Sequence, residues 1–141
     1  MPAWTCPKCH RQFGRKGQSH ECSPAMSLDE YFSTGPERER PIFEAVHGYL
    51  ETLGPIHVEP VSVGIFLKAT GSFVELRPLT KWVAMSFPLP YQLDHSRIAR
   101  KMSSGRGSTV TYHVVNLREA ADLDDTVKAW LAESYDFVTS S

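Results

Sequence analysis

The sequence predicts an α+β protein, in which an antiparallel β-sheet meander is flanked by N- and C-terminal helices and preceded by a small zinc finger. Three observations support this fold class. Apolar residues recur at helical spacing over residues 41–53 and again over residues 122–135. Between these segments, β-branched and aromatic runs alternate with short turns, as in antiparallel strands. All three cysteines lie between positions 6 and 22.

These segments divide the chain into three parts. They are a CCHC zinc finger (residues 1–24), a linker with a short helix (residues 25–35) and an α+β domain (residues 36–138). The capping box Ser27-Leu-Asp-Glu30 indicates the linker helix. The helix over residues 41–53, which begins there or several residues earlier, ends at Gly54-Pro55, because glycine and proline terminate helices.

The region between the helices predicts five strands joined by short turns. They comprise residues 56–60, 61–67, 73–78, 80–87 and 109–117. Residues 94–102 are predicted to form a short helix capped by Asp94 or Ser96, and residues 103–107 a flexible loop. The final helix has an acidic first turn, which suits the positive end of a helix dipole.

The N-terminal segment carries a metal-binding pattern, Cys-x2-Cys followed by His-x-Cys. Two close pairs of thiolate and imidazole ligands are what a tetrahedral zinc site requires. We therefore expect Cys6, Cys9, His20 and Cys22 to bind one structural Zn²⁺. Two alternatives remain: His10 replaces Cys22 as a ligand, or no metal is bound.

The spacing of the last two ligands distinguishes this finger from a DNA-reading finger. His20 and Cys22 would point to opposite faces of an ideal helix, so the long recognition helix of such fingers is not expected. Phe13 and Trp4 are the large apolar side chains available to cover the metal site. Four protein ligands also close the coordination sphere, so we expect no hydrolytic chemistry at this metal.

The finger is basic. Lys8 lies within the first ligand pair, and Arg11, Arg15 and Lys16 lie in the loop between the two pairs. Such a cluster can contact the phosphates of nucleic acid. It can equally offset the negative charge of a zinc ion with three thiolate ligands. The two interpretations do not exclude each other.

The overall charge argues against strong non-specific binding to nucleic acid or to anionic membranes, because the net charge is −1. The charges are unevenly distributed, with basic segments over residues 1–22 and 94–118 and acidic ones over residues 27–59 and 119–136. No apolar run approaches the length of a membrane span, and the first residues do not resemble a signal peptide. Three cysteines in this pattern fit a reducing compartment, so we expect a cytoplasmic protein.

Several motifs together resemble a known family. They are Cys-Pro-Lys-Cys…Gln-Ser-His-Glu-Cys, Leu-Asp-Glu-Tyr-Phe, Leu-Gly-Pro-Ile-His-Val-Glu-Pro-Val and Asp-Leu-Asp-Asp-Thr-Val-Lys-Ala-Trp-Leu-Ala-Glu-Ser-Tyr. The chain is similar to a bacterial domain-of-unknown-function family with a short N-terminal CCHC finger. Its domain also occurs at the C-terminal ends of predicted transport and restriction-associated proteins. The resemblance implies the α+β domain and no established activity.

A second group of residues could form a ligand site in the α+β domain. His95, Arg97, Arg100, Lys101 and His113 can meet where the preceding loop returns to the last strand. The meander adds Lys68, Arg77, Lys81 and Trp82, of which some must share a face. A cleft lined by arginine, histidine and tryptophan suits an anionic or aromatic ligand. The other interpretation is a hydrogen-bonded histidine and ordinary surface cations.

No catalytic residue emerges from the sequence, which contains no nucleophile motif and no phosphate-binding loop. We therefore favour a non-catalytic binding or adaptor protein, whose finger and α+β domain present a surface to nucleic acid or to a partner protein. The alternative is a small anionic ligand-binding or enzymatic pocket around Arg97 and His113. A third possibility is an accessory domain that acts through a separate partner.

Overall fold

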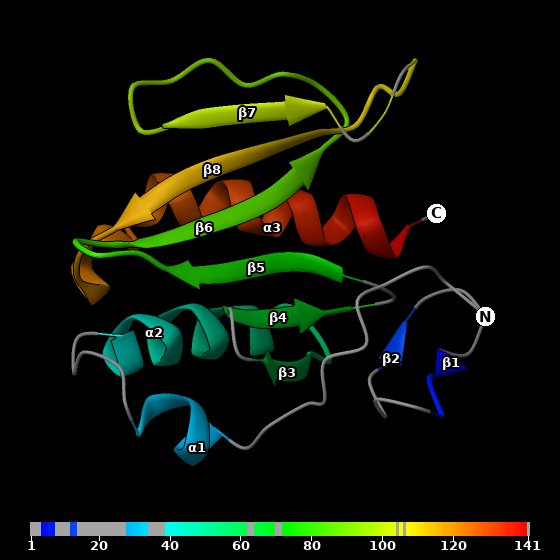
Figure 1. The fold of residues 1–141 in the computed structure, drawn as a ribbon. Helices are drawn as coiled ribbons and strands as arrows, with labels where there is room; N and C mark the ends of the chain where they lie inside the picture. Colours follow the sequence, from blue (N-terminus) through cyan, green and yellow to red (C-terminus); the bar gives the residue numbers. More distant parts are fainter. Residues whose placement is uncertain are drawn as a thin grey trace.

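A six-stranded antiparallel sheet forms the centre of the protein (Figure 1). The computed structural model describes residues 4–7, 12–13, 28–33, 39–61, 64–69, 72–103, 105 and 107–140. The strands, in the spatial order β3-β4-β5-β6-β8-β7, are β3 (His57–Val61), β4 (Gly64–Lys68), β5 (Ser72–Pro78), β6 (Val83–Leu89), β8 (Thr111–Leu117) and β7 (Arg100–Ser103). The antiparallel sheet and its flanking helices confirm the predicted α+β class.

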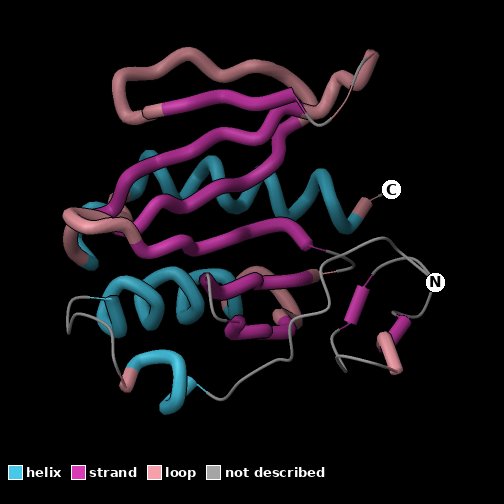
Figure 2. Tube along the Cα trace, in the orientation of Figure 1, coloured by secondary structure: helices cyan, strands magenta, loops and turns pink. Residues whose placement is uncertain are grey.

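Two long helices, α2 (Glu39–Glu51) and α3 (Asp125–Thr139), pack on one face of this sheet. Figure 2 shows them in cyan, with α3 running alongside β5 and β6. A short helix, α1 (Leu28–Phe32), precedes α2, as the capping box predicted, and a 3-10 turn, η1 (Ala120–Asp122), precedes α3. The carboxylate of Asp124 caps α3 by accepting a hydrogen bond of 3.0 Å from the backbone N–H of Val127.

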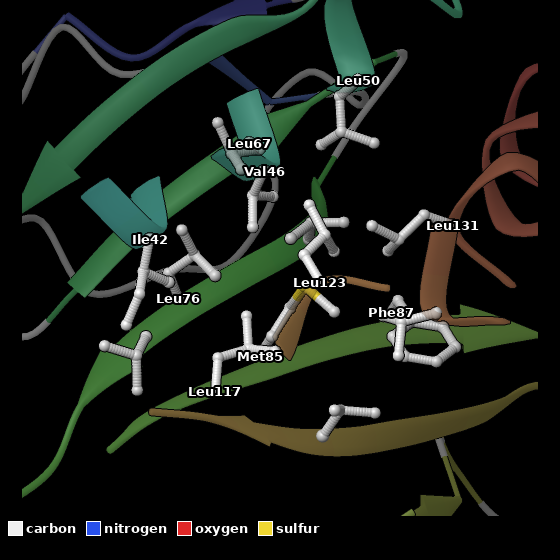
Figure 3. Packing of buried hydrophobic residues seen from close by; sticks show 14 of the residues in the cluster. Ile42, Val46, Leu50, Leu67, Leu76, Met85, Phe87, Leu117, Leu123 and Leu131 are labelled. Carbon is white, nitrogen blue, oxygen red and sulfur yellow. The ribbon is translucent and has the colours of Figure 1, made fainter. Parts of the chain in front are cut away.

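One hydrophobic core joins both helices to the sheet (Figure 3). Val46 and Leu50 of α2 point toward Met85 of β6 and Leu131 of α3, and all four are fully buried. Because each buried aliphatic side chain contributes about 1.5–3 kcal/mol, this layer is the main source of stability of the domain.

The alternation of side chains along the strands gives the sheet two different faces. Along β6, Val83, Met85 and Phe87 are buried under the helices, whereas Ala84 and Ser86 are partly exposed on the opposite side. The same alternation holds along β8. We refer to the side opposite α2 and α3 as the open face.

The predicted helix over residues 94–102 is wrong. The backbone N–H of Ile98 donates to the carbonyl of His95 in a single turn, at 3.0 Å, and the chain then becomes strand β7. β7 pairs with β8, with Arg100 opposite Val114, so β8 lies between β6 and β7 and the simple meander order is lost at this edge. Pairing with a distant strand overrides the local helical preference.

Two predicted strand boundaries also change. The strand predicted over residues 80–87 instead runs from Val83 through Leu89 as β6, and so continues past Pro88. The register of β5 with β6 reaches only to Ser86 among the described residues, so the missing N–H of Pro88 breaks no hydrogen bond toward β5. The strand predicted from residue 61 instead begins at Gly64, where an added Cβ would lie 2.6 Å from the carbonyl oxygen of Leu76. Glycine therefore permits β4 to approach β5 closely.

Across the described part of the chain, every helix is too short or too polar to traverse a lipid bilayer.

Candidate functional site

The open face carries a depression of about 570 Å³ over its β5–β7 end. It is lined by alternate residues of four strands, by residues of the loop between β5 and β6, and by Ala99 just before β7, namely Glu75, Arg77, Leu79, Trp82, Ala84, Ser86, Ala99, Arg100, Met102, Val114 and Asn116. Side chains alternate between the two faces of a strand, and each strand residue in this group lies on the face that points away from α2 and α3. The volume lies in the range of ~300–1,000 Å³ that is typical of ligand-binding pockets.

Cationic side chains predominate around this depression. Arg77 and Arg100 both line it and are exposed, and Glu75, 3.8 Å from Arg77, is the acidic residue in its lining. The guanidinium of Arg118 lies 5.5 Å from the centre of the Trp82 ring. Such a separation permits a cation–π interaction, which orients both groups. The depression therefore suits a negatively charged ligand.

Trp82 supplies the depression with an aromatic ring and a hydrogen-bond donor. The backbone N–H of Leu79 donates to the carbonyl of Trp82 at 2.8 Å, and this turn fixes the ring at the end of β5. The indole Nε1 is shielded from solvent and has no acceptor among the residues that the structure describes. Buried indole N–H groups usually find a partner, so this donor is an unsatisfied polar group beside the depression.

Apolar side chains are exposed at the same place. Leu79 and Met102 are 44% and 36% exposed, and they belong to the three most exposed large apolar side chains of the described residues. Both line the depression, Leu79 from the β5–β6 loop and Met102 from β7. An exposed apolar surface bordered by cations is typical of an interaction site.

The other end of the open face is closed by a buried ionic cluster. The ammonium group of Lys68 lies 2.8 Å from the carboxylate of Glu59, and both side chains are at least 97% buried. His57 Nε2 lies 2.9 Å from the same carboxylate. A buried pair of this kind is favourable only if hydrogen bonds satisfy the remaining polar atoms.

Those hydrogen bonds come from the N-terminal hairpin formed by β1 (Trp4–Thr5) and β2 (Gln12–Phe13). The backbone N–H of Gln12 donates to Glu59 at 2.6 Å, and Lys68 donates to the carbonyl of Gln12. The hairpin is thus attached to the open face through the ionic cluster, beside β3 and β4 (Figure 1). Charge-assisted hydrogen bonds are about twice as strong as neutral ones.

The same hairpin contains the start of the predicted zinc finger. Cys6 directly follows β1, is 3% exposed and packs with Trp4. Its predicted co-ligands Cys9, His20 and Cys22 lie outside the described residues, so the zinc site stays a prediction. No group of three potential ligands occurs within the residues that are described, which leaves out most of the finger. A buried thiol at the end of a short strand, followed by the segment that holds Cys9, fits the first half of such a site.

Arg97, predicted to help form a pocket, holds a loop against α3. Its guanidinium donates to the Asp124 carboxylate at 2.6 Å and to the Asp122 carbonyl at 2.7 Å. His95 accepts from the backbone N–H of Arg97 at 3.0 Å and packs edge-on against Trp130, with ring centroids 5.0 Å apart. These contacts connect the loop before β7 to the N-terminal end of α3.

His113 lies on the helix-covered side of β8 and is fully buried. Its Nε2 accepts a hydrogen bond of 2.9 Å from the backbone N–H of Leu93, and its ring stacks on Phe87 with centroids 5.7 Å apart. Burial lowers the pKa of His113 from its ordinary value, because the charged imidazolium loses its solvation. Neither Arg97 nor His113 lines the depression, whereas Arg100 does.

Sequence reasoning found part of this site. Arg77, Trp82 and Arg100 were named as candidates and line one depression, whereas Lys68 belongs to the buried cluster. The polar residues Ser86 and Asn116 were missed. Their signal was the alternation of small or polar residues with large apolar ones along two predicted strands. The basic residues Lys8, Arg11, Arg15 and Lys16 lie outside the described part of the chain.

A six-stranded antiparallel sheet, covered by two long helices on one face and bearing a cationic depression on the other, defines an α+β domain with one sheet face open for binding. The chain belongs to the family described as Domain of unknown function (DUF5655), whose model matches residues 28–138. The match contains the whole sheet, α2 and all but the last residue of α3, and it begins after the predicted finger. No curated protein and no solved structure matches the chain.

Proposed function

We propose that the protein is a non-catalytic, zinc-containing binding protein of the cytoplasm whose sheet and N-terminal finger together contact nucleic acid. The observation that carries this proposal is the depression on the open face, where Trp82 lies among Arg77, Arg100 and Arg118. Arginine side chains contact phosphates, and aromatic side chains stack on bases.

The attachment of the N-terminal hairpin supports a two-part surface. Gln12 in β2 contacts Glu59 and Lys68 on the same side of the sheet that carries the depression. The predicted finger therefore begins on the same side of the sheet as the depression, where a bound nucleic-acid chain would run. Its four basic residues would extend the cationic surface beyond the sheet, although the net charge of −1 keeps this attraction local.

Salt dependence of binding tests the proposal. Fluorescence anisotropy of a labelled oligonucleotide should show affinity that falls roughly 20-fold between ~50 and ~200 mM salt if about three phosphates are neutralised. Zinc content, measured on the same sample, should be about one ion per chain.

A matched pair of substitutions on β7 sharpens the experiment. Arg100→Gln removes a charge from the depression, whereas Lys101→Gln removes one from the adjacent residue, which lies on the opposite side of the strand and pairs with Asp94. Only Arg100→Gln should weaken binding. If no oligonucleotide binds and a protein co-purifies instead, a partner protein is the correct occupant and the nucleic-acid proposal fails.

A further inference from the structure

The depression contains features that the phosphates of a double helix would not use. Phosphate binding requires only cations, yet Leu79 and Met102 expose apolar surface there and Trp82 adds a ring with an unpartnered N–H among the described residues. In a duplex the bases are stacked inside, and a protein surface meets mainly backbone and groove edges. Apolar and aromatic side chains between cations therefore match a base that is free to leave its stack.

The size and shape of the depression also favour an unstacked base over a duplex. Its volume of about 570 Å³ is that of a small-ligand pocket, and it opens on four strands rather than on a protruding helix or ribbon. Protein elements that read a duplex enter a groove as a helix or a two-stranded ribbon. A concave sheet surface with an aromatic platform instead receives unstacked bases one at a time.

The hydrogen-bonding groups of the lining also suit a base edge. Asn116 offers both a donor and an acceptor, and Ser86 offers a hydroxyl. Arg77 and Arg100 approach from β5 and from β7, which lie on opposite sides of the β6–β8 pair. A base between them would therefore have a cation available on each side for its flanking phosphates.

We infer that the depression binds an unpaired base and its flanking phosphates, so that the ligand is single-stranded nucleic acid rather than a duplex. This inference rests on the proposed function and makes it specific. Trp82 supplies the stacking surface, Arg77 and Arg100 bind the phosphates, and Leu79 and Met102 add apolar contact around the base.

The test compares one labelled single strand of ~12 nucleotides with its duplex, using the full-length zinc-loaded protein. The single strand should bind at least about tenfold more tightly. Trp82→Ala should weaken single-strand binding at least about fivefold, as expected for loss of one stacked base, and Trp82→Phe should retain most of it. A circular dichroism melt of each variant confirms that it is folded, and the Phe variant keeps the comparison meaningful if the Ala variant is not.

The outcomes separate the inference from the proposed function. Equal affinity for single strand and duplex, unaffected by Trp82→Ala, overturns the inference but leaves nucleic-acid binding standing. Failure of both probes to bind overturns both. A nucleoside monophosphate that binds as tightly as the strand also overturns the inference, because the pocket would then be a small-ligand site.

Discussion

The two ends of the open face use the same kinds of residue for different purposes. At the β3–β4 end, Glu59 and Lys68 form an ion pair that is at least 97% buried beneath the N-terminal hairpin. At the β5–β7 end, Glu75 and Arg77 form a longer pair of 3.8 Å that is open to solvent. Charges that are covered must be paired for the protein to fold, whereas charges left uncovered are free to meet a ligand. Substitutions at the two ends should accordingly affect different measurements.

The largest effect is expected from Lys68→Met, which leaves the Glu59 carboxylate buried without its cation. The free energy of unfolding should fall by about 3–5 kcal/mol in urea titrations. The double variant Lys68→Met/Glu59→Leu should recover much of this loss, because no uncompensated charge remains.

An exposed ion pair provides the control for Lys68→Met. Arg40 and Glu44 on α2 are 3.3 Å apart and largely exposed, so Arg40→Met should cost under about 1 kcal/mol. If Lys68→Met cost no more than Arg40→Met, the Glu59–Lys68 pair would not be a structurally required buried pair.

Removing the first predicted zinc ligand should have the next largest effect. Cys6→Ser should abolish binding of about one zinc per chain and release the hairpin, with a loss of about 1–3 kcal/mol as the Gln12 contacts to the ionic cluster are lost. Metal analysis checks the first part, and faster hydrogen exchange of the Gln12 amide checks the second. Full zinc content in this variant would contradict the ligand assignment.

Stability should also depend on pH through His113, on the helix-covered side. Burial lowers the pKa of His113 below its ordinary value of 6.5, so the unfolded chain takes up this proton at a higher pH than the folded one. The contribution of neutral, buried His113 to the free energy of unfolding is fully present above pH 6.5. The stability of the protein then falls as the pH drops below 6.5 toward the pKa of His113 in the folded state.

His113→Gln isolates this contribution, because glutamine can accept the hydrogen bond from Leu93 but does not titrate. Urea titrations between about pH 7 and 5 should give a flatter profile for this variant. The pKa values of Asp94 and Asp124 are lowered from 3.8, by the Lys101 hydrogen bond and by the Val127 N–H respectively, so both titrate below this window. An unchanged slope would exclude His113 as the titrating group.

The smallest effect on stability is expected in the depression itself. Arg77→Gln should change the free energy of unfolding by less than about 0.5 kcal/mol, because Arg77 is exposed and its pair with Glu75 is long. The same variant should reduce the slope of log affinity against log salt by about 0.7 for a single strand. A large stability loss would show that this end of the face is structural after all.

The predictable parts of the fold are those with a local signal. The α2 and α3 segments were found because Val46 and Leu131 belong to apolar stripes with helical period, and strands such as β8 because large apolar residues alternate along them. Strand β7 was missed because Arg100–Ser103 is exposed throughout and shows no alternation. Its conformation is set by pairing with β8, which the local sequence does not encode.

The sequence predicted which types of residue form the candidate site, but not which of these residues lie together. Arginine, histidine and tryptophan were expected to converge, yet His113 faces the helices and Arg97 contacts the N-terminal end of α3. For β-strand residues, a shift of one position changes the face, so register decides which side chains meet. The Glu59–Lys68 cluster likewise depends on the pairing of β3 with β4 and on a hairpin some 47 residues away in sequence from Glu59.

Strand β7 has a further consequence for how the protein behaves in concentrated solution. It is the last strand of the sheet, and an edge strand can recruit the edge of another copy into a continuous sheet. Arg100 places an exposed positive charge on this short edge, while Lys101 on the other side of the strand pairs with Asp94, and two such edges brought together would bring the two Arg100 charges close to each other. Arg100, which lines the depression, thus also protects the sheet from self-association, and neutralising it would leave the exposed side chain of Met102 on an edge without that charge.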